Sequence, residues 1–247
     1  MIELNTFSIT ARCPETGKLG IAIASAIPCT GSISSYIEPG VGAVATQAYC
    51  NPYLGLSGLA EMRAGRAAAE TLETVLSQDA DRDVRQCAMV DAAGGAAVWT
   101  GADCTELAGH RKGDGVLIAG NMLTGAEVLD AMFAQYQDTK SMAFEARLLA
   151  ALQAGDQVGG DRRGKQSAAL RVYAAEAFPW MDLRIDDHRD PLRALTALFD
   201  TVSRQLTPFI ADMPRRDDWG RRPSPETAAL LAQSPQERAR KTYKTRG

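Results

Sequence analysis

Hydrophobic and polar residues alternate at the start of the chain, and this alternation predicts a β-strand. Residues 6–12 read Thr-Phe-Ser-Ile-Thr-Ala-Arg, a period of two that is typical of a strand with one buried face. Pro14 and Gly17 supply turn signals, because proline presets φ and glycine tolerates positive φ. An apolar run at 19–25 follows the turn. The two segments therefore predict a β-hairpin.

The rest of the chain alternates between short apolar runs and stretches with the period of a helix. Two of the runs are separated by Ala-Ala-Gly-Gly at 92–95, which predicts a second hairpin. The predicted strands are residues 41–48, 86–91, 96–100, 116–119, 166–173 and 183–186, and the predicted helices are residues 56–62, 68–76, 124–136, 141–154 and 190–206. Two hairpins that are each followed by helices predict an α+β fold with antiparallel sheets covered by helices.

Composition divides the chain into a body and a tail. The 247 residues are 45% apolar, which suits one globular domain with an appendage. Residues 215–247 are rich in Pro and Arg and hold nine Lys or Arg against four Asp or Glu. We therefore predict a domain at 1–211 and a basic C-terminal tail at 212–247. Two Ser-Pro pairs, at 224 and 234, predict short helices in the tail.

Net charge, cysteine spacing and hydropathy exclude several classes of protein. The formal net charge is −3 with a pI near 5.5, so the whole chain lacks the basic balance of a nucleic-acid-binding protein. The five cysteines are scattered without a Cys-x-x-Cys pair, which argues against a disulfide framework or a zinc site. His110 and His188 have no acidic pair at metal-ligand spacing, so no metal site is predicted. Neither a signal peptide nor a membrane-spanning run is visible, and we expect a cytoplasmic protein without membrane contact.

Six short segments form a more specific combination. They are residues 6–9, 19–25, 40–48, 120–123, 159–164 and 186–188. Together they resemble an uncharacterised bacterial family placed in the N-terminal-nucleophile (Ntn) hydrolase superfamily, the domain of unknown function 1028. The resemblance covers roughly the first four-fifths of the chain. It implies a four-layer α-β-β-α sandwich with two packed antiparallel sheets, and it implies no particular substrate.

The resemblance makes Thr6 the candidate nucleophile. In Ntn hydrolases a Thr, Ser or Cys opens the first strand, and its own α-amine, with a pKa of about 8, accepts the hydroxyl proton. Met1 to Asn5 precede Thr6 in this chain, so either the Asn5–Thr6 bond is cut or this mechanism is not available. The alternative is that Thr6 is a β-branched strand residue that only packs and forms hydrogen bonds.

Four residues at the ends of predicted strands are further candidates for the site. Ser25 ends the strand that faces Thr6, so its hydroxyl could orient the nucleophile or satisfy nearby backbone groups. Arg12 shares the strand face of Thr6 by the period of two, and it could hold a carboxylate or cap the strand in water. Gln47 and Asn121 end apolar strands, where an amide could stabilise an oxyanion, and turn chemistry is the alternative. We assign Asn121 to catalysis and the other three to substrate binding.

The loop at 159–164 is a candidate anion site. Its two adjacent arginines, Arg162 and Arg163, lie between glycines and could clamp an anionic group of a substrate. Asp161 could hold one of the guanidiniums in place. A solvated loop with a salt bridge is the alternative.

These residues and the resemblance predict an amidohydrolase that acts on a small or peptide-like amide and requires no cofactor. The first alternative is a non-catalytic protein that binds a small metabolite on the same scaffold, with its nucleophile masked by the five leading residues. The second alternative is an assembly protein whose basic tail docks a partner chain. Apolar outer helices and a long terminal segment are compatible with a homodimer.

Overall fold

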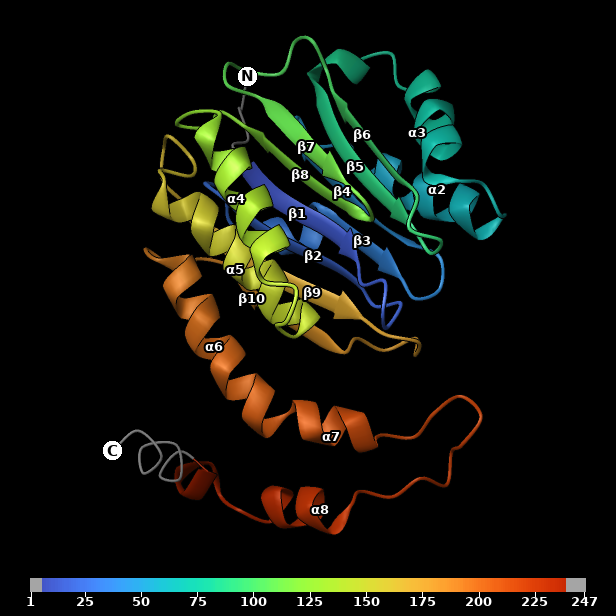
Figure 1. The fold of residues 1–247 in the computed structure, drawn as a ribbon, viewed down its shortest axis with the longest axis vertical. Coiled ribbons are helices and arrows are strands. Elements are labelled where there is room, and N and C mark those ends of the chain that lie inside the picture. The colour runs from blue at the N-terminus through green and yellow to red at the C-terminus, as the bar shows by residue number, and fades with distance from the viewer. Residues whose placement is uncertain (1–5, 239–247) are drawn as a thin grey trace. The chain divides into compact units, whose positions relative to one another are not determined.

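Two antiparallel sheets form the centre of the computed structural model, which describes residues 6–238 (Figure 1). The larger sheet has six strands in the order β10-β9-β2-β1-β8-β7, and the smaller has four in the order β3-β4-β5-β6. The strands are β1 (Thr6–Arg12), β2 (Leu19–Ser25), β3 (Ser35–Glu38), β4 (Gly42–Ala48), β5 (Arg85–Asp91), β6 (Ala96–Thr100), β7 (Gly109–Gly113), β8 (Val116–Asn121), β9 (Ser167–Tyr173) and β10 (Met181–Ile185). The helices are α1 (Thr30–Ile33), α2 (Pro52–Arg63), α3 (Ala68–Ser77), α4 (Glu127–Asp138), α5 (Phe144–Gln157), α6 (Pro191–Gln205), α7 (Thr207–Asp212) and α8 (Pro225–Leu231).

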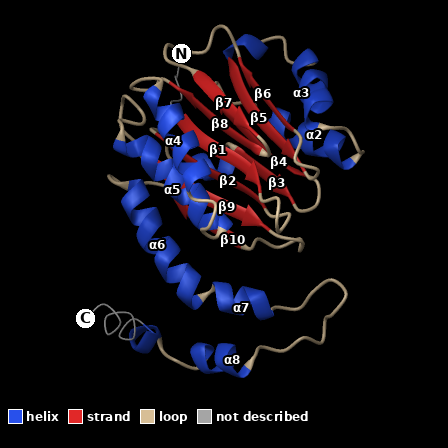
Figure 2. Ribbon diagram, in the orientation of Figure 1, coloured by secondary structure: helices blue, strands red, loops and turns tan. Residues whose placement is uncertain are grey.

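Helices cover the outer face of each sheet, so the strands and helices form four layers (Figure 2). Helices α4 and α5 contact strands of the six-stranded sheet, and α2 and α3 contact strands of the four-stranded sheet. Contacts of β1 with β4 and of β5 with β8 join the inner faces of the two sheets. The α+β fold of two packed antiparallel sheets that the sequence predicts is confirmed.

The space between the sheets is apolar over most of its length. Ile21, Ile23 and Leu117 of the larger sheet are buried with Ala43 and Val90 of the smaller sheet. Full burial of a Leu or Ile side chain stabilises the fold by roughly 1.5–3 kcal/mol, so this layer contributes a large part of the folding free energy. The polar residues described below interrupt this apolar layer at one end of the strands.

Gly20 lets helix α5 lie close to the larger sheet. A Cβ atom at this position would be 2.5 Å from Leu148 and 2.9 Å from Phe144, both on α5. These separations are far below the contact distance of two carbon atoms, about 3.5–4.0 Å. Packing of the helix therefore requires glycine in the returning strand of the first hairpin.

Contacts along the chain divide it into two units, residues 1–196 and 197–247. Helix α6 buries Pro191, Leu192 and Leu195 near its start, whereas no residue at 197–209 is buried. This division follows the burial of the chain, and the boundary at 211/212, which rests on composition, stays a prediction.

The second unit contains the two helices predicted from the Ser-Pro pairs. Ser224 caps α8, since its hydroxyl accepts the backbone N–H of Thr227 at 3.2 Å. Ser234 and Glu237 exchange side-chain to backbone hydrogen bonds, which is the predicted capping box. Asn5 lies outside the described residues, so whether the Asn5–Thr6 bond is cut stays open. Within residues 6–238, every helix is too short or too polar to cross a bilayer.

Candidate functional site

Four polar residues form a row across one end of the six-stranded sheet. Thr6 lies opposite Ser25 on β2 and opposite Asn121 on β8, and Ser25 lies opposite Ser167 on β9. Directly opposed residues place their side chains on the same face of a sheet, with Cβ atoms about 5 Å apart. All four residues are at most 2% exposed. The structure therefore brings three residues predicted from the sequence, Thr6, Ser25 and Asn121, into one buried row.

Hydrogen bonds orient the hydroxyl groups of this row. Thr6 Oγ1 lies 3.1 Å from Ser25 Oγ, and either atom can donate. Ser167 Oγ donates to the carbonyl of Ile27 at 2.6 Å and accepts the N–H of Thr30 at 3.1 Å. Ser25 thus holds the Thr6 side chain, and Ser167 holds the segment that follows β2.

A ladder of buried amides connects this row to the second sheet. Ser8 Oγ donates to Gln47 Oε1 at 2.7 Å, and Gln47 Nε2 donates to Gln86 Oε1 at 2.7 Å. Asn121 Nδ2 donates to the same Gln86 oxygen at 3.1 Å. Gln86 Nε2 in turn donates to Thr100 Oγ1 at 2.9 Å and to the carbonyl of Gly120 at 3.0 Å. Gln47 is therefore part of the link between the sheets, and Gln86 is the centre of the ladder.

Three residues of this arrangement, Gln86, Thr100 and Ser167, are absent from the sequence-based set. Gln86 is fully buried in β5 between Arg85 and Cys87, and it lies in register with Gln47 and Thr100. A buried amide is stable only when its donors and acceptors are paired. A glutamine at the start of a strand that continues with apolar residues was thus the signal available in the sequence.

Replacing Gln86 with leucine is expected to lower the free energy of unfolding by about 2–4 kcal/mol, because amides of Gln47 and Asn121 lose their buried acceptor. Urea unfolding of the two proteins measures the difference. Gln157→Leu makes the same change at an exposed position and should alter stability by less than about 0.5 kcal/mol. An equally small effect at Gln86 would show that the ladder contributes little to the fold.

The backbone is strained at the same end of the sheets. Among residues 6–238, four non-glycine residues adopt positive φ angles: Cys29 at 57°, Ala48 at 63°, Leu107 at 58° and Met122 at 50°. Ala48 directly follows Gln47, and Met122 directly follows Asn121. Such residues cost on the order of 1–3 kcal/mol each and cluster at functional sites. The strain supports this end of the sandwich as the functional one.

The loop at 159–164 lies beside the strand end that carries Asn121. Leu123 and Asp161 form an isolated β-bridge, and the N–H of Arg162 donates to the carbonyl of Met122 at 3.3 Å. Asp161 is 6% exposed, and its Oδ1 accepts the backbone N–H of Arg163 at 2.9 Å. The arginine side chains are exposed. The loop is thus anchored through its backbone and Asp161, with both guanidiniums in solvent.

The structure does not bring Arg12 to this site. Arg12 is the last residue of β1 and Thr6 the first, so about 20 Å separates them along a strand that rises about 3.3 Å per residue. The period of two predicts a shared face and carries no information on distance. Arg12 instead lines a cavity with Tyr136 and Arg147.

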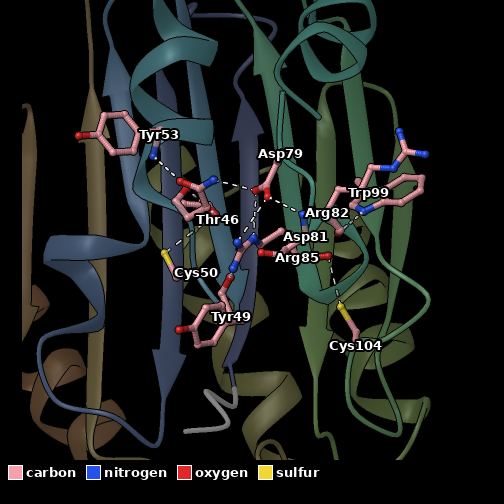
Figure 3. Close-up of polar contacts among 11 residues, drawn as sticks. Thr46, Tyr49, Cys50, Tyr53, Asp79, Asp81, Arg82, Arg85, Trp99 and Cys104 are labelled. Atoms are coloured by element: carbon pink, nitrogen blue, oxygen red, sulfur yellow. Dashed lines mark hydrogen bonds and ion pairs between the residues drawn. The ribbon is translucent and has the colours of Figure 1, made fainter. Parts of the chain in front are cut away.

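A buried ion pair braces the segment that follows Gln47 (Figure 3). Arg85 Nε donates to Asp79 Oδ2 at 3.0 Å, and Arg85 Nη1 donates to the carbonyl of Tyr49 at 2.8 Å. Asn51, the N-cap of α2, donates to Asp79 Oδ2 at 2.7 Å. Burial acts to raise the pKa of Asp79, but the hydrogen bonds from Arg85 and Asn51 outweigh it, and the pKa is lowered. The pair holds β5 and the end of β4 together next to the amide ladder.

Ionisable groups with the spacing of a metal site do not occur among residues 6–238, where no three His, Cys, Asp or Glu side chains converge. His110 Nδ1 lies 3.0 Å from Thr100 Oγ1, at the far end of the amide ladder. Burial, and to a lesser extent Arg111, lowers the pKa of His110. A pKa below the ordinary value of histidine, about 6.5, favours the neutral imidazole at pH 7.

The fold and the site define a layered α+β sandwich with a buried hydroxyl row at the start of its central strand. The model of the family described as "Family of unknown function (DUF1028)" matches residues 6–195, and the chain belongs to this family. Its match begins at Thr6.

Two solved structures resemble the chain. Protein SPO2555 from Silicibacter pomeroyi, a member of the same family, is 34% identical with a TM-score of 0.80, covering 88% of this chain and 98% of that one. Anbu, the ancestral beta-subunit from Yersinia bercovieri, is 11% identical with a TM-score of 0.40, covering 84% of this chain and 98% of that one. No curated protein matches the chain.

Proposed function

We propose that this protein is an amidohydrolase of the Ntn superfamily and that Thr6 becomes its nucleophile when the Asn5–Thr6 bond is cut. One observation carries the proposal: Thr6 begins a central strand with its hydroxyl 3.1 Å from Ser25 and with Asn121 opposite. The start of the family match at Thr6 supports it. A hydroxyl at the head of a central strand, beside a second hydroxyl and an amide, matches the chemical needs of an amine-assisted acyl transfer.

The proposed reaction has two steps. The Thr6 oxygen attacks the amide carbon, and its proton passes to the freed α-amine of the same residue. Collapse of the tetrahedral intermediate breaks the C–N bond, and the α-ammonium returns the proton to the leaving amine. Water then hydrolyses the Thr6 ester and restores the hydroxyl.

Two neighbours of Thr6 have roles in this proposal. Ser25 orients the hydroxyl through the hydrogen bond described above. Asn121 is the oxyanion donor, because Gln86 fixes the plane of its amide beside Thr6. Arg162 and Arg163 extend from the adjacent loop into solvent, where they can attract an anionic group of a substrate. Arg12 lies too far from Thr6 to take part.

The experiment compares the full-length chain with a chain that begins at Thr6, produced behind a cleavable fusion partner. The shortened chain is expected to release 4-nitroaniline from a panel of amino-acid 4-nitroanilides and to gain one adduct on Thr6 from a β-lactone. The full-length chain should do neither unless its intact mass shows that residues 1–5 have been lost. A folded chain that starts at Thr6 and shows neither release nor adduct would overturn the proposal.

A non-catalytic metabolite-binding protein is the second candidate. It is favoured by the burial of Thr6, which is only 2% exposed in the described structure. If this candidate is correct, the uncut chain should be purified together with a small molecule. Denaturation should release that molecule into the supernatant, where mass spectrometry would detect it.

We further propose that the protein works in a reducing compartment such as the cytoplasm. The five cysteines are free thiols, which persist in such a compartment. The proposed reaction requires no cofactor. Neither reaction step needs a second copy of the chain. Analytical ultracentrifugation would test separately whether the protein forms a homodimer.

A further inference from the structure

A cavity of about 210 Å³ lies at the end of β1 opposite to Thr6. The β1–β2 turn, the β7–β8 turn and helices α4 and α5 surround it. Its charged and polar lining includes Arg12, Glu15, Asp114, Tyr136, Lys140 and Arg147. Three of these side chains are cationic at pH 7 and two are anionic, so the lining carries a net positive charge.

Arg147 is the most deeply buried of the cations. It is 6% exposed, its Nη2 donates to the carbonyl of Tyr136 at 3.1 Å, and its guanidinium lies 4.1 Å from the centre of the Tyr136 ring. Its Nε atom is buried without a hydrogen-bond partner among residues 6–238. Buried cations in proteins are normally paired with an anion. Among residues 6–238, no carboxylate lies within ion-pair distance of Arg147, although the charge of Arg147 helps to lower the pKa of Glu15.

Arg12, at the end of strand β1, also has a nitrogen atom in its guanidinium group that is unpaired within residues 6–238. Its Nε atom is also buried without a hydrogen-bond partner in the part of the chain that the structure describes. The backbone N–H of Arg12 donates to the carbonyl of Gly115 at 2.9 Å, which fixes the end of β1 at the cavity. Two guanidiniums therefore line one small cavity, each with an unused buried donor.

The two carboxylates at the cavity do not satisfy these donors. Glu15 is exposed and accepts a hydrogen bond from Cys13 Sγ at 3.1 Å, which lowers the pKa of Glu15. Asp114 is exposed in the β7–β8 turn. Arg147 acts on Glu15 only as a more distant charge, and within residues 6–238 neither carboxylate lies within ion-pair distance of Arg12 or Arg147.

Tyr136 offers a further donor at the cavity. Burial is the main cause that raises its pKa, to about 12. Its hydroxyl consequently keeps its proton at neutral pH and can donate to an anion. Lys140 is exposed at the rim and adds a third positive charge.

We propose that this cavity binds a small oxyanion, a carboxylate or a phosphate, held between the guanidiniums of Arg12 and Arg147. The planar fork of arginine matches two oxygens of such an anion, and a charge-assisted hydrogen bond would satisfy each buried Nε donor. The cavity is about 20 Å along β1 from Thr6, so the anion does not react there. The inference does not depend on amide hydrolysis.

Isothermal titration of the full-length protein tests the site, with sodium phosphate and sodium succinate as separate probes in a chloride-free buffer. At least one probe is expected to bind. Arg12→Gln should weaken that binding by about tenfold or more, since one charge-assisted contact is lost. Arg147→Lys should weaken it similarly, because an ammonium cannot reproduce the fork. Arg66→Gln removes the same charge from an exposed position outside the cavity lining and should leave the affinity unchanged.

A second measurement covers the case in which an Arg147 variant does not fold. The probe that binds should raise the melting temperature of the wild type and not that of Arg12→Gln, because an anion that binds only the folded state stabilises it. Stronger binding of phosphate would identify a phosphate site, and stronger binding of succinate a carboxylate site. Absence of binding by both probes, or equal binding by the wild type and Arg12→Gln, would overturn the proposal. The two guanidiniums would then be expected to pair with the carboxylates of Glu15 and Asp114 in solution.

Discussion

Replacing Thr6 with alanine in a chain that begins at residue 6 is expected to lower kcat/KM for amide hydrolysis by at least about a thousandfold. The change removes the attacking oxygen and leaves the α-amine in place. It also removes the hydrogen bond to Ser25, which contributes only about 1 kcal/mol to the fold. Loss of activity should therefore occur without unfolding. Release of 4-nitroaniline measures the rate, and urea unfolding measures the stability.

Two variants control this experiment. Thr6→Ser keeps both the hydroxyl and the amine and should retain measurable turnover. Thr10→Val changes a buried threonine on the same strand and face to a side chain of similar shape, and it should leave the rate unchanged. If the Thr6→Ala chain hydrolyses substrate like the parent, another group attacks and the assignment of Thr6 is wrong.

The fold was predictable where local signals were strong. The hairpin of β1 and β2 has both a period of two and turn residues, and the structure pairs Thr6 with Ser25 in that hairpin. Strand β7 was missed because its sequence, Gly-His-Arg-Lys-Gly, has no apolar alternation. It forms an edge of the larger sheet, where charged side chains are common because they discourage pairing with other chains.

The site was predictable only in part, because its contacts are distant in sequence. Ser25 follows from the register of one hairpin, whereas Asn121 reaches Thr6 through a strand pairing that joins positions 115 residues apart. Gln86 joins the site from the other sheet, and no local pattern specifies how two sheets stack. For Arg12, the period of two predicted the correct strand face. It did not predict that Arg12 lies at the opposite end of β1 from Thr6, too far away to join the site.

Replacing Asp79 with alanine is expected to lower the free energy of unfolding by about 3–5 kcal/mol at pH 7, because Arg85 would remain buried without its carboxylate. The side chains of the pair are only 10% and 8% exposed. Asn51 would lose its acceptor as well. Urea unfolding measures the loss. Asp130→Ala breaks the exposed pair with Arg111 and should cost less than about 1 kcal/mol.

The pH dependence of the same pair provides an independent check. The folded-state pKa of Asp79 is lowered, so its carboxylate stabilises the fold above the unfolded-state pKa of about 3.9, and the stabilisation is lost as the pH falls through the folded value. The stability difference between the wild type and Asp79→Ala should therefore be constant near neutral pH and shrink below about pH 4. If the stability difference between the wild type and Asp79→Ala stays the same below about pH 4, Asp79 stabilises the fold through packing. The ion pair with Arg85 would then not be what holds the segment after Gln47.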